Sequence, residues 1–113
     1  MVIKTIRKKL PAAYVKTAIG KLKEKLIAEG LPVKRVILFG SYAKNRPHID
    51  SDIDVAVILD SSKNFNRQKI DRVAWWAKQI DVKLETHILS EADFNNRWLS
   101  LPAQIKKFGE EVK

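Results

Sequence analysis

The sequence contains no cysteine and no long uninterrupted apolar stretch. The absence of cysteine excludes disulfides and thiolate metal sites. A membrane-spanning helix needs roughly 20 consecutive apolar residues, and no stretch approaches that length. The first nine residues are basic, but no apolar region with a small-residue cleavage site follows them, so we expect no secretory signal. The absence of a spanning stretch and of a secretory signal favours a cytoplasmic protein with no membrane as partner, whereas the lack of cysteine does not by itself indicate a compartment.

An excess of basic residues, 22 Lys and Arg against 13 Asp and Glu, produces a formal net charge of +9 over 113 residues. A charge of this size favours nucleic acid, nucleotides or an acidic protein as partners. The basic residues concentrate at 4–9, at 16–25 and at Lys106 and Lys107. No RNA-recognition, zinc-finger or helix-turn-helix pattern accompanies them, so nucleic-acid binding is the weaker interpretation of the charge. Solvated helix faces account for most of these lysines.

The chain has the length of one domain, which we place at 1–113. A hydrophobic content of 45% and a charged content of 31% are typical of a globular protein. A chain of 113 residues buries about two thirds of its unfolded surface but has no room for a separate substrate domain of normal size. Any second substrate must therefore be held by this domain, by a second copy in a homo-oligomer or by another protein.

Apolar periodicity and turn residues predict an α/β (α+β) chain in which helices and strands alternate. Pro11 suits the first turn of a helix and Gly30 suits its C-terminal cap. Ser90, with Asp93 three residues later, resembles a capping box. The expected elements after the first helix are strands at 34–39 and 52–59, a helix at 66–79, a strand at 82–89, and helices at 91–99 and 102–108.

The most informative motif joins the first two strands. Gly40 and Ser41 end an apolar strand, and after ten residues Asp52 and Asp54 begin the next one. Side chains alternate along a strand, so Asp52 and Asp54 share a face with Cα atoms roughly 6.6 Å apart. Carboxylates and phosphates are the usual ligands of Mg²⁺. Two such ions clamp the attacking and leaving oxygens of a phosphoryl transfer. The spacing predicts a metal-dependent nucleotide site.

The loop between the strands supplies candidate phosphate ligands. Gly40 lets the backbone approach a ligand closely, Ser41 adds a hydroxyl, and the following amides face an anion if a helix begins near Tyr42. Lys44 is a candidate phosphate ligand, whereas ordinary solvated charge is the better interpretation of Arg46. A calcium loop is excluded because Val55 and Ser61 occupy the places of its glycine and glutamate. A P-loop is excluded because no Lys-Ser or Lys-Thr pair closes a Gly-x4-Gly element.

Residues 38–44 and 51–54 resemble the minimal nucleotidyltransferases of the DNA polymerase β-like superfamily, and the likeness extends more loosely over most of the chain. The resemblance implies a mixed sheet with flanking helices. It also implies that ATP or another nucleoside triphosphate donates a nucleoside monophosphate to an acceptor with release of pyrophosphate. The sequence departs from the family pattern at Lys44, where an arginine is common, and at Asn45, where a glycine is common.

The family's third carboxylate comes from a later strand, for which this sequence offers Glu85 and Asp81. We prefer Glu85, because the residues around it resemble the form in which a glutamate supplies that ligand. Its role would be to bind metal or to accept the proton of the acceptor. Asp81 is the alternative, although a turn position between helix and strand also explains it. For His87, a partly exposed strand position is the better interpretation, although it could touch the site.

The leading functional hypothesis is a nucleotidyltransferase that uses Mg²⁺, with two ions, and ATP. Asp52, Asp54 and Glu85 would hold metal, and Gly40, Ser41 and Lys44 would hold phosphate. The resemblance extends to the antitoxin half of toxin–antitoxin pairs, which implies a helical, HEPN-type protein partner. Trp75 projects from the apolar arc of its helix and suits a partner contact. The alternatives are a non-catalytic module that neutralises a partner by contact, and a basic nucleic-acid-binding domain.

Overall fold

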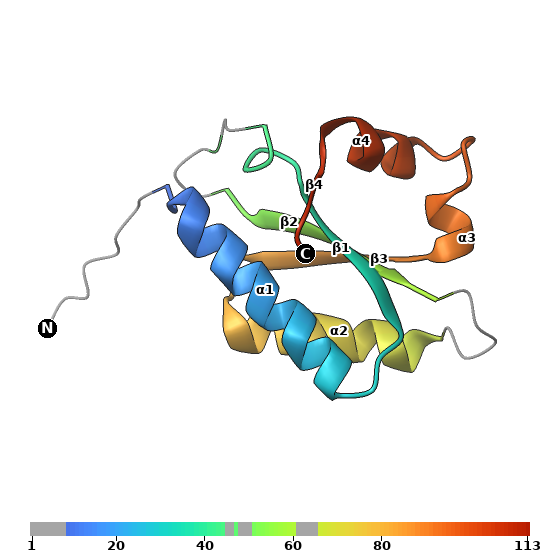
Figure 1. The fold of residues 1–113 in the computed structure, drawn as a ribbon, viewed down its shortest axis with the longest axis horizontal. Helices are drawn as coiled ribbons and strands as arrows, with labels where there is room; N and C mark the ends of the chain where they lie inside the picture. Colours follow the sequence, from blue (N-terminus) through green and yellow to red (C-terminus); the bar gives the residue numbers. More distant parts are fainter. Residues whose placement is uncertain (1–8, 45–46, 48–50, 61–65) are drawn as a thin grey trace, which may run out of the picture.

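The computed structural model describes residues 9–44, 47, 51–60 and 66–113. These residues form a four-stranded sheet with helices on both faces (Figure 1). No helix among them is long and apolar enough to cross a membrane. The elements in chain order are α1 (Ala12–Ala28), β1 (Val33–Phe39), β2 (Ile53–Leu59), α2 (Arg67–Ile80), β3 (Leu84–Ser90), α3 (Glu91–Phe94), α4 (Ser100–Phe108) and β4 (Glu110–Glu111).

The sheet has the strand order β3-β2-β1-β4. β1 pairs antiparallel with β2 and with β4, whereas β2 pairs parallel with β3. The helix α2 makes the crossover between the two parallel strands, as a parallel connection requires. The predicted mixed sheet with flanking helices is therefore confirmed.

The two faces of the sheet are covered unequally. α1 and α2 cover one face, where Leu22 and Val73 pack on Val36 and Val55 in the larger core cluster. The short helices α3 and α4 cover part of the other face, where the smaller cluster contains Phe39, Ala56, Ile58, Phe94 and Ile105. β2 is buried from Val55 to Leu59 on both faces, which explains why its sequence is a continuous apolar run.

Local signals set several of the element ends. Gly30 follows α1 with a φ of 81°, and the Ser90 hydroxyl accepts a hydrogen bond from the Asp93 N–H, so both predicted caps are confirmed. The predicted helix at 91–99 is wrong beyond Phe94. The Asn96 side chain accepts a hydrogen bond from the Trp98 N–H at 3.0 Å, and this local turn replaces the helical hydrogen bonds there.

The sequence analysis did not predict β4. Glu110 and Glu111 pair with Leu38 and Ile37 of β1 after α4 ends at Gly109. Two charged residues carry no apolar alternation, so a strand this short gives no periodic signal. The predicted exposure of Trp75 is confirmed, because 55% of its surface is accessible while Val73 and Ala77 of the same helix are buried.

Asn66 caps α2 by accepting a hydrogen bond from the Lys69 N–H at 3.0 Å. We expect Asn66→Ala to lower the free energy of unfolding by about 1 kcal/mol, because it leaves a helical N–H without a partner. Urea unfolding followed by circular dichroism measures the change. Asn66→Ser keeps a capping oxygen and is the matched control. Equal stability of the alanine and serine variants would contradict the capping role.

Candidate active site

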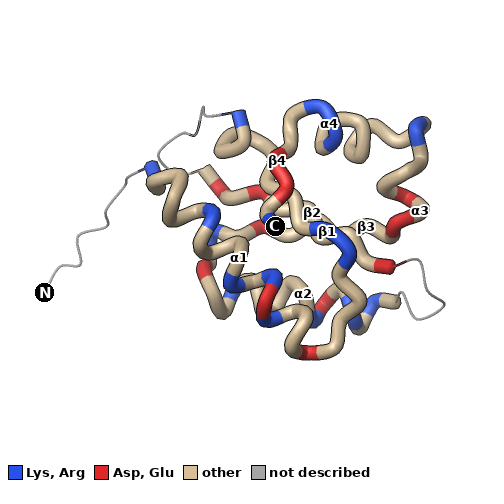
Figure 2. The backbone as a smooth tube through the Cα atoms, in the orientation of Figure 1, with Lys and Arg blue, Asp and Glu red and all other residues tan. Residues whose placement is uncertain are grey.

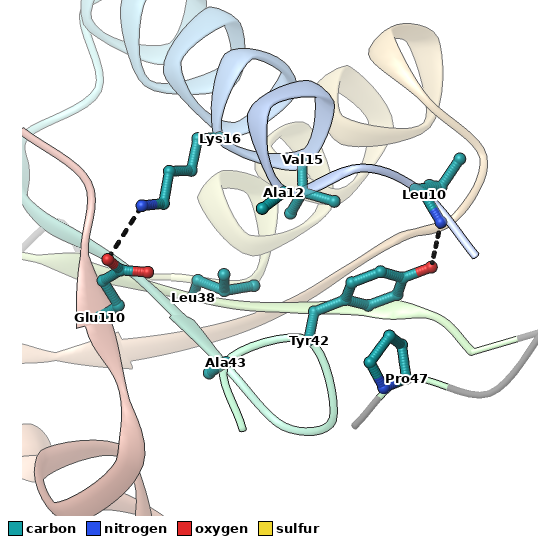
Figure 3. A pocket seen from close by; sticks show the side chains of 9 residues that line it. All are labelled: Leu10, Ala12, Val15, Lys16, Leu38, Tyr42, Ala43, Pro47 and Glu110. Atoms are coloured by element: carbon teal, nitrogen blue, oxygen red, sulfur yellow. Dashed lines mark hydrogen bonds and ion pairs between the residues drawn. The ribbon is translucent and has the colours of Figure 1, made fainter. Parts of the chain in front are cut away.

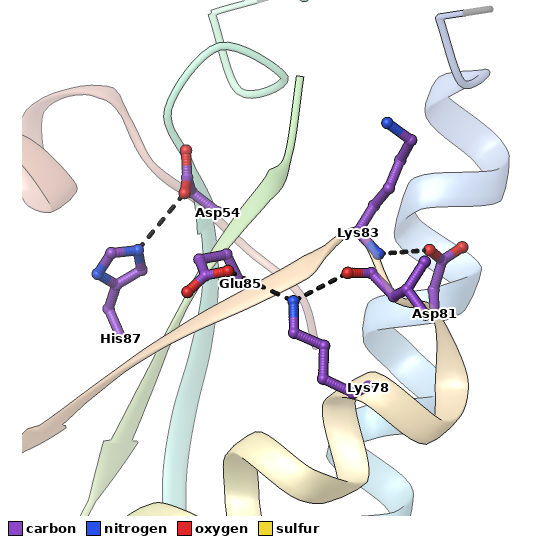
Figure 4. A network of polar contacts seen from close by, with 7 residues as sticks. Asp54, Lys78, Asp81, Lys83, Glu85 and His87 are labelled. Atoms are coloured by element: carbon purple, nitrogen blue, oxygen red, sulfur yellow. Dashed lines mark hydrogen bonds and ion pairs between the residues drawn. The ribbon is translucent and has the colours of Figure 1, made fainter. Parts of the chain in front are cut away.

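The centre of the candidate site is Asp54, the second residue of β2. Its register places it opposite Phe39, the last residue of β1, and opposite Glu85 in β3. Residues paired across neighbouring strands point to the same face of the sheet. Asp54, Glu85 and His87 therefore share the face that α3 and α4 cover only in part. Figure 4 shows these three side chains close together on the sheet.

Gly40 packs its backbone directly against Asp54. A Cβ atom at Gly40 would overlap the Asp54 Oδ2 and lie 3.1 Å from the Asp54 Cβ. Gly40 also has a φ of 76°, a left-handed conformation that glycine adopts without steric cost. Both constraints exclude a side chain there, and together they bring the turn after β1 onto the carboxylate.

Residues 41–44 follow Gly40 as a hydrogen-bonded turn, in which the Lys44 N–H donates to the Gly40 carbonyl at 3.1 Å. The sequence analysis considers a helix beginning near Tyr42, and the structure has this hydrogen-bonded turn in its place. The Lys44 ammonium group lies 4.6 Å from the centre of the Phe108 ring, so its contact in this structure is with α4. Arg46 lies outside the described residues.

The Asp54 carboxylate is partly buried, with 31% of its side chain exposed, and it contacts His87. The distance from His87 Nε2 to Asp54 Oδ1 is 3.4 Å, and the His87 ring packs edge-on against Phe39 at 5.0 Å between ring centres. Burial raises the pKa of Asp54, the charges of Asp52 and Glu85 raise it further, and the contact with His87 opposes the rise. The charges of Asp52 and Glu85 thus both act on Asp54 at this end of the sheet.

Glu85 has a cationic neighbour that the sequence analysis missed. Lys78 of α2 donates to Glu85 Oε2 at 3.3 Å and to the Val82 carbonyl at 2.8 Å. Nothing in the local sequence signals this contact, because it depends on how α2 packs beside β3. Asp52, which precedes β2, is exposed. Each of the two strand carboxylates, Asp54 and Glu85, therefore has a nitrogen-bearing neighbour.

Asp81, the alternative third carboxylate, lies at the turn between α2 and β3. It accepts a hydrogen bond from the Tyr14 hydroxyl of α1 and another from the Lys83 N–H at 2.8 Å. The hydrogen bond to Asp81 raises the pKa of Tyr14. Figure 4 shows Asp81 on the side of α1, away from Asp54. Its contacts are those of a turn residue, whereas Glu85 is the residue paired with Asp54.

A pocket of about 200 Å³ lies next to the turn on the α1 side of the sheet (Figure 3). Leu10, Val15 and Leu38 line it, and the Tyr42 hydroxyl on its wall accepts a hydrogen bond from the Leu10 N–H at 3.1 Å. The Lys16–Glu110 ion pair, at 3.0 Å, closes one side. Because Leu38 points to the face opposite Asp54, this pocket lies behind the turn rather than at the carboxylates.

The donor atoms on the Asp54 face suit a hard cation. Among the described residues, no three acidic or histidine side chains gather closely enough to form a metal site by themselves. The available groups are carboxylate oxygens, which Mg²⁺ prefers, and it usually binds through one or two of them together with substrate phosphates. Burial and the charges of Asp52 and Glu85 disfavour the ionised form of Asp54, and a bound cation would favour it. The chemistry of the donors therefore fits Mg²⁺ held jointly with a phosphate.

Three glycine-to-alanine substitutions separate the constraints on Gly40. Gly20→Ala, inside α1 with free space around it, should stabilise the protein by about 0.5–1 kcal/mol. Gly30→Ala should cost about 1–2 kcal/mol from its positive φ alone. Gly40→Ala should cost more than Gly30→Ala, because it also displaces Asp54. Chemical unfolding gives the three values, and equal costs at positions 30 and 40 would contradict the packing of Gly40 on Asp54.

The raised pKa of Asp54 predicts a pH dependence of stability. The Asp54 carboxyl group keeps its proton to a higher pH in the folded state than in the unfolded chain. The stability that this proton contributes is therefore lost as the pH rises above the ordinary pKa of 3.8. Asp54→Asn removes that loss. We expect the free energy of unfolding of the variant, relative to wild type, to increase from pH 4 to pH 7. A difference that falls over this range would show that ionised Asp54 is stabilised in the folded state.

Comparisons with known proteins show the fold and the family of this chain. No curated protein matches the chain by sequence. A toxin–antitoxin structure with AMP-PNP has a TM-score of 0.59 at 20% identity, and the match covers 87% of this chain and 72% of the matched chain. The structure of a tri-AMPylated Shewanella oneidensis HEPN toxin in complex with an MNT antitoxin has a TM-score of 0.54 at 18% identity. This match covers 91% of the present chain and 72% of the matched chain. Both share the fold. Residues 17–109 match the nucleotidyltransferase domain family, and the chain belongs to it.

Proposed function

We propose that this nucleotidyltransferase moves AMP from ATP to a hydroxyl group on a partner protein. The observation that carries the proposal is the arrangement around Asp54, with Gly40 packed on one side and Glu85 paired on the other. A triphosphate held by the turn after β1 would lie beside these carboxylates. The family match supports nucleotidyl transfer as the reaction class.

The proposed roles follow from position. Gly40 and Ser41 would hold the phosphates through backbone amides and the serine hydroxyl, and Lys44 would leave the Phe108 ring to add its charge. Asp52, Asp54 and Glu85 would hold Mg²⁺, which supplies charge neutralisation of the triphosphate when bound. The Glu85 carboxylate is the candidate acceptor of the proton from the attacking hydroxyl, since its side chain is half exposed on the open part of the sheet face.

The partner is the second part of the proposal. The AMP-PNP structure contains a toxin–antitoxin pair, and the Shewanella oneidensis structure contains an AMPylated HEPN toxin with an MNT antitoxin. These neighbours support an antitoxin-type role, with a helical HEPN-type protein as the acceptor. The exposed Trp75 supports a protein contact at α2, because tryptophan contributes strongly to many interfaces.

A contact-only module is the second candidate. The contacts of Asp54 with His87 and of Glu85 with Lys78 favour it, because a metal must compete with both nitrogen groups. In that case nucleotide would serve only structure or regulation. The two candidates differ in one respect: a contact-only module still binds and silences its partner after Asp52→Asn.

Calorimetric titration of ATP with and without Mg²⁺ tests the proposed site without knowledge of the acceptor. We expect wild-type binding to depend on Mg²⁺ and Asp52→Asn to weaken it at least about tenfold, because the variant loses a charged metal ligand. Asp71→Asn, on α2 at the opposite face, is the control that removes a carboxylate elsewhere. Equal binding by wild type and Asp52→Asn would contradict the metal-binding role of Asp52.

A further inference from the structure

Phe108, at the end of α4, has a lysine near its ring from two different segments. Lys107 of the same helix places its ammonium group 5.2 Å from the ring centre. Lys44, from the turn after β1, places its ammonium group 4.6 Å from the same centre. The ring is still 43% exposed. An aromatic face with two cations is therefore available to a ligand on this side of the molecule.

The same combination recurs along α4 and the segment before it. Trp98 is 83% exposed, and the Arg97 guanidinium lies 5.3 Å from its ring centre. Lys106 lies 4.9 Å from the ring of the buried Phe94. We call this the α4 surface and define it by six residues: Lys44, Arg97, Trp98, Lys106, Lys107 and Phe108.

The cations of the α4 surface contact aromatic rings rather than carboxylates. In the described part of the chain, none of its four cations forms an ion pair with a carboxylate. Ion pairs elsewhere neutralise Lys16, Lys25, Arg35, Arg67, Arg72 and Lys78. Figure 2 shows basic positions at α4, at the turn after β1 and between α3 and α4 along one edge of the molecule. Positive charge thus collects here without local compensation.

Helix chemistry explains only part of this charge. Lys106 and Lys107 lie in the last turn of α4, where the helix dipole favours cations. Lys44 and Arg97 come from outside the helix, and the dipole does not account for them. Nor does a solvated helix face require exposed Phe108 and Trp98, since large aromatic groups in water are unfavourable. A ligand that is complementary to both the cations and the exposed rings carries negative charge and has flat apolar faces.

We infer that the α4 surface binds single-stranded nucleic acid, a role separate from the proposed transfer of AMP. The phosphates of the nucleic acid pair with Lys44, Arg97, Lys106 and Lys107, and its unpaired bases stack on the exposed rings of this surface. A duplex hides the faces of its bases and offers only charge. The surface lies on the same side of the sheet as Asp54, since α4 packs on that face.

Fluorescence anisotropy with a labelled ten-nucleotide single-stranded RNA tests the inference. Lys106→Ala/Lys107→Ala should weaken binding at least tenfold and reduce the slope of log affinity against log salt by about 1.4, or 0.7 for each lost phosphate contact. Trp98→Ala, at a side chain that is almost fully exposed, should weaken binding about fivefold without changing that slope, because it removes stacking rather than charge.

Lys21→Ala/Lys69→Ala is the matched control, because it removes two lysines from α1 and α2 on the opposite face. This variant should keep wild-type affinity. Equal losses in the two double variants would overturn the inference and leave only a general effect of net charge. Tighter binding of polyglutamate than of the RNA, unaffected by Trp98→Ala, would also overturn it and would assign the surface to an acidic protein. Asp52→Asn should bind the RNA normally whether or not it transfers AMP.

Discussion

The register of β2 between its two neighbours is the constraint on which the rest of the site depends. Asp54 lies opposite Phe39 on one side and opposite Glu85 on the other. A slip of one residue would turn Asp54 into the apolar core beneath α1 and α2 and would expose Val55. Burial of β2 on both faces from Val55 onward opposes such a slip. The hydrophobic core therefore determines where the carboxylate points, although it contributes no atom to the chemistry.

Unequal covering of the sheet makes the site accessible. On the face of α3 and α4, Ala56 and Ile58 are buried beneath Phe94 and Ile105. Asp54 and Glu85, nearer the beginnings of their strands, stay partly exposed on the same face. Because α3 has only four residues, the helical cover ends before it reaches these carboxylates. One face thus provides both a packed region that supports the strands and an open region where polar groups meet solvent.

Charge is distributed unevenly over the same face. Burial raises the pKa of Asp54 and the charges of Asp52 and Glu85 add to the rise, whereas His87 contacts Asp54 and Lys78 contacts Glu85. Along α4 the balance reverses, because cations there contact aromatic rings in place of carboxylates. The positions of the charged residues are therefore more informative than the net charge of +9. The carboxylates around Asp54 lie on the same side of the sheet as the basic α4 surface. This arrangement suits anionic ligands that bind together with their own cations.

The sequence by itself determined the approximate positions of the strands, the turn at Gly40 and Ser41 and the alternation of side chains within each strand, because these are local properties. The mixed sheet was expected from the resemblance to a known family, and the tertiary structure decided that Asp54 pairs with Glu85. The sequence did not determine the end of α3, where an Asn96 side chain competes with the helix, or β4, which has no apolar pattern. Only the tertiary structure decided that Lys78 approaches Glu85, that Asp81 instead contacts Tyr14, and that Lys44 lies over Phe108. These contacts join segments distant in the sequence, and their geometry follows from how helices pack on the sheet rather than from local propensity.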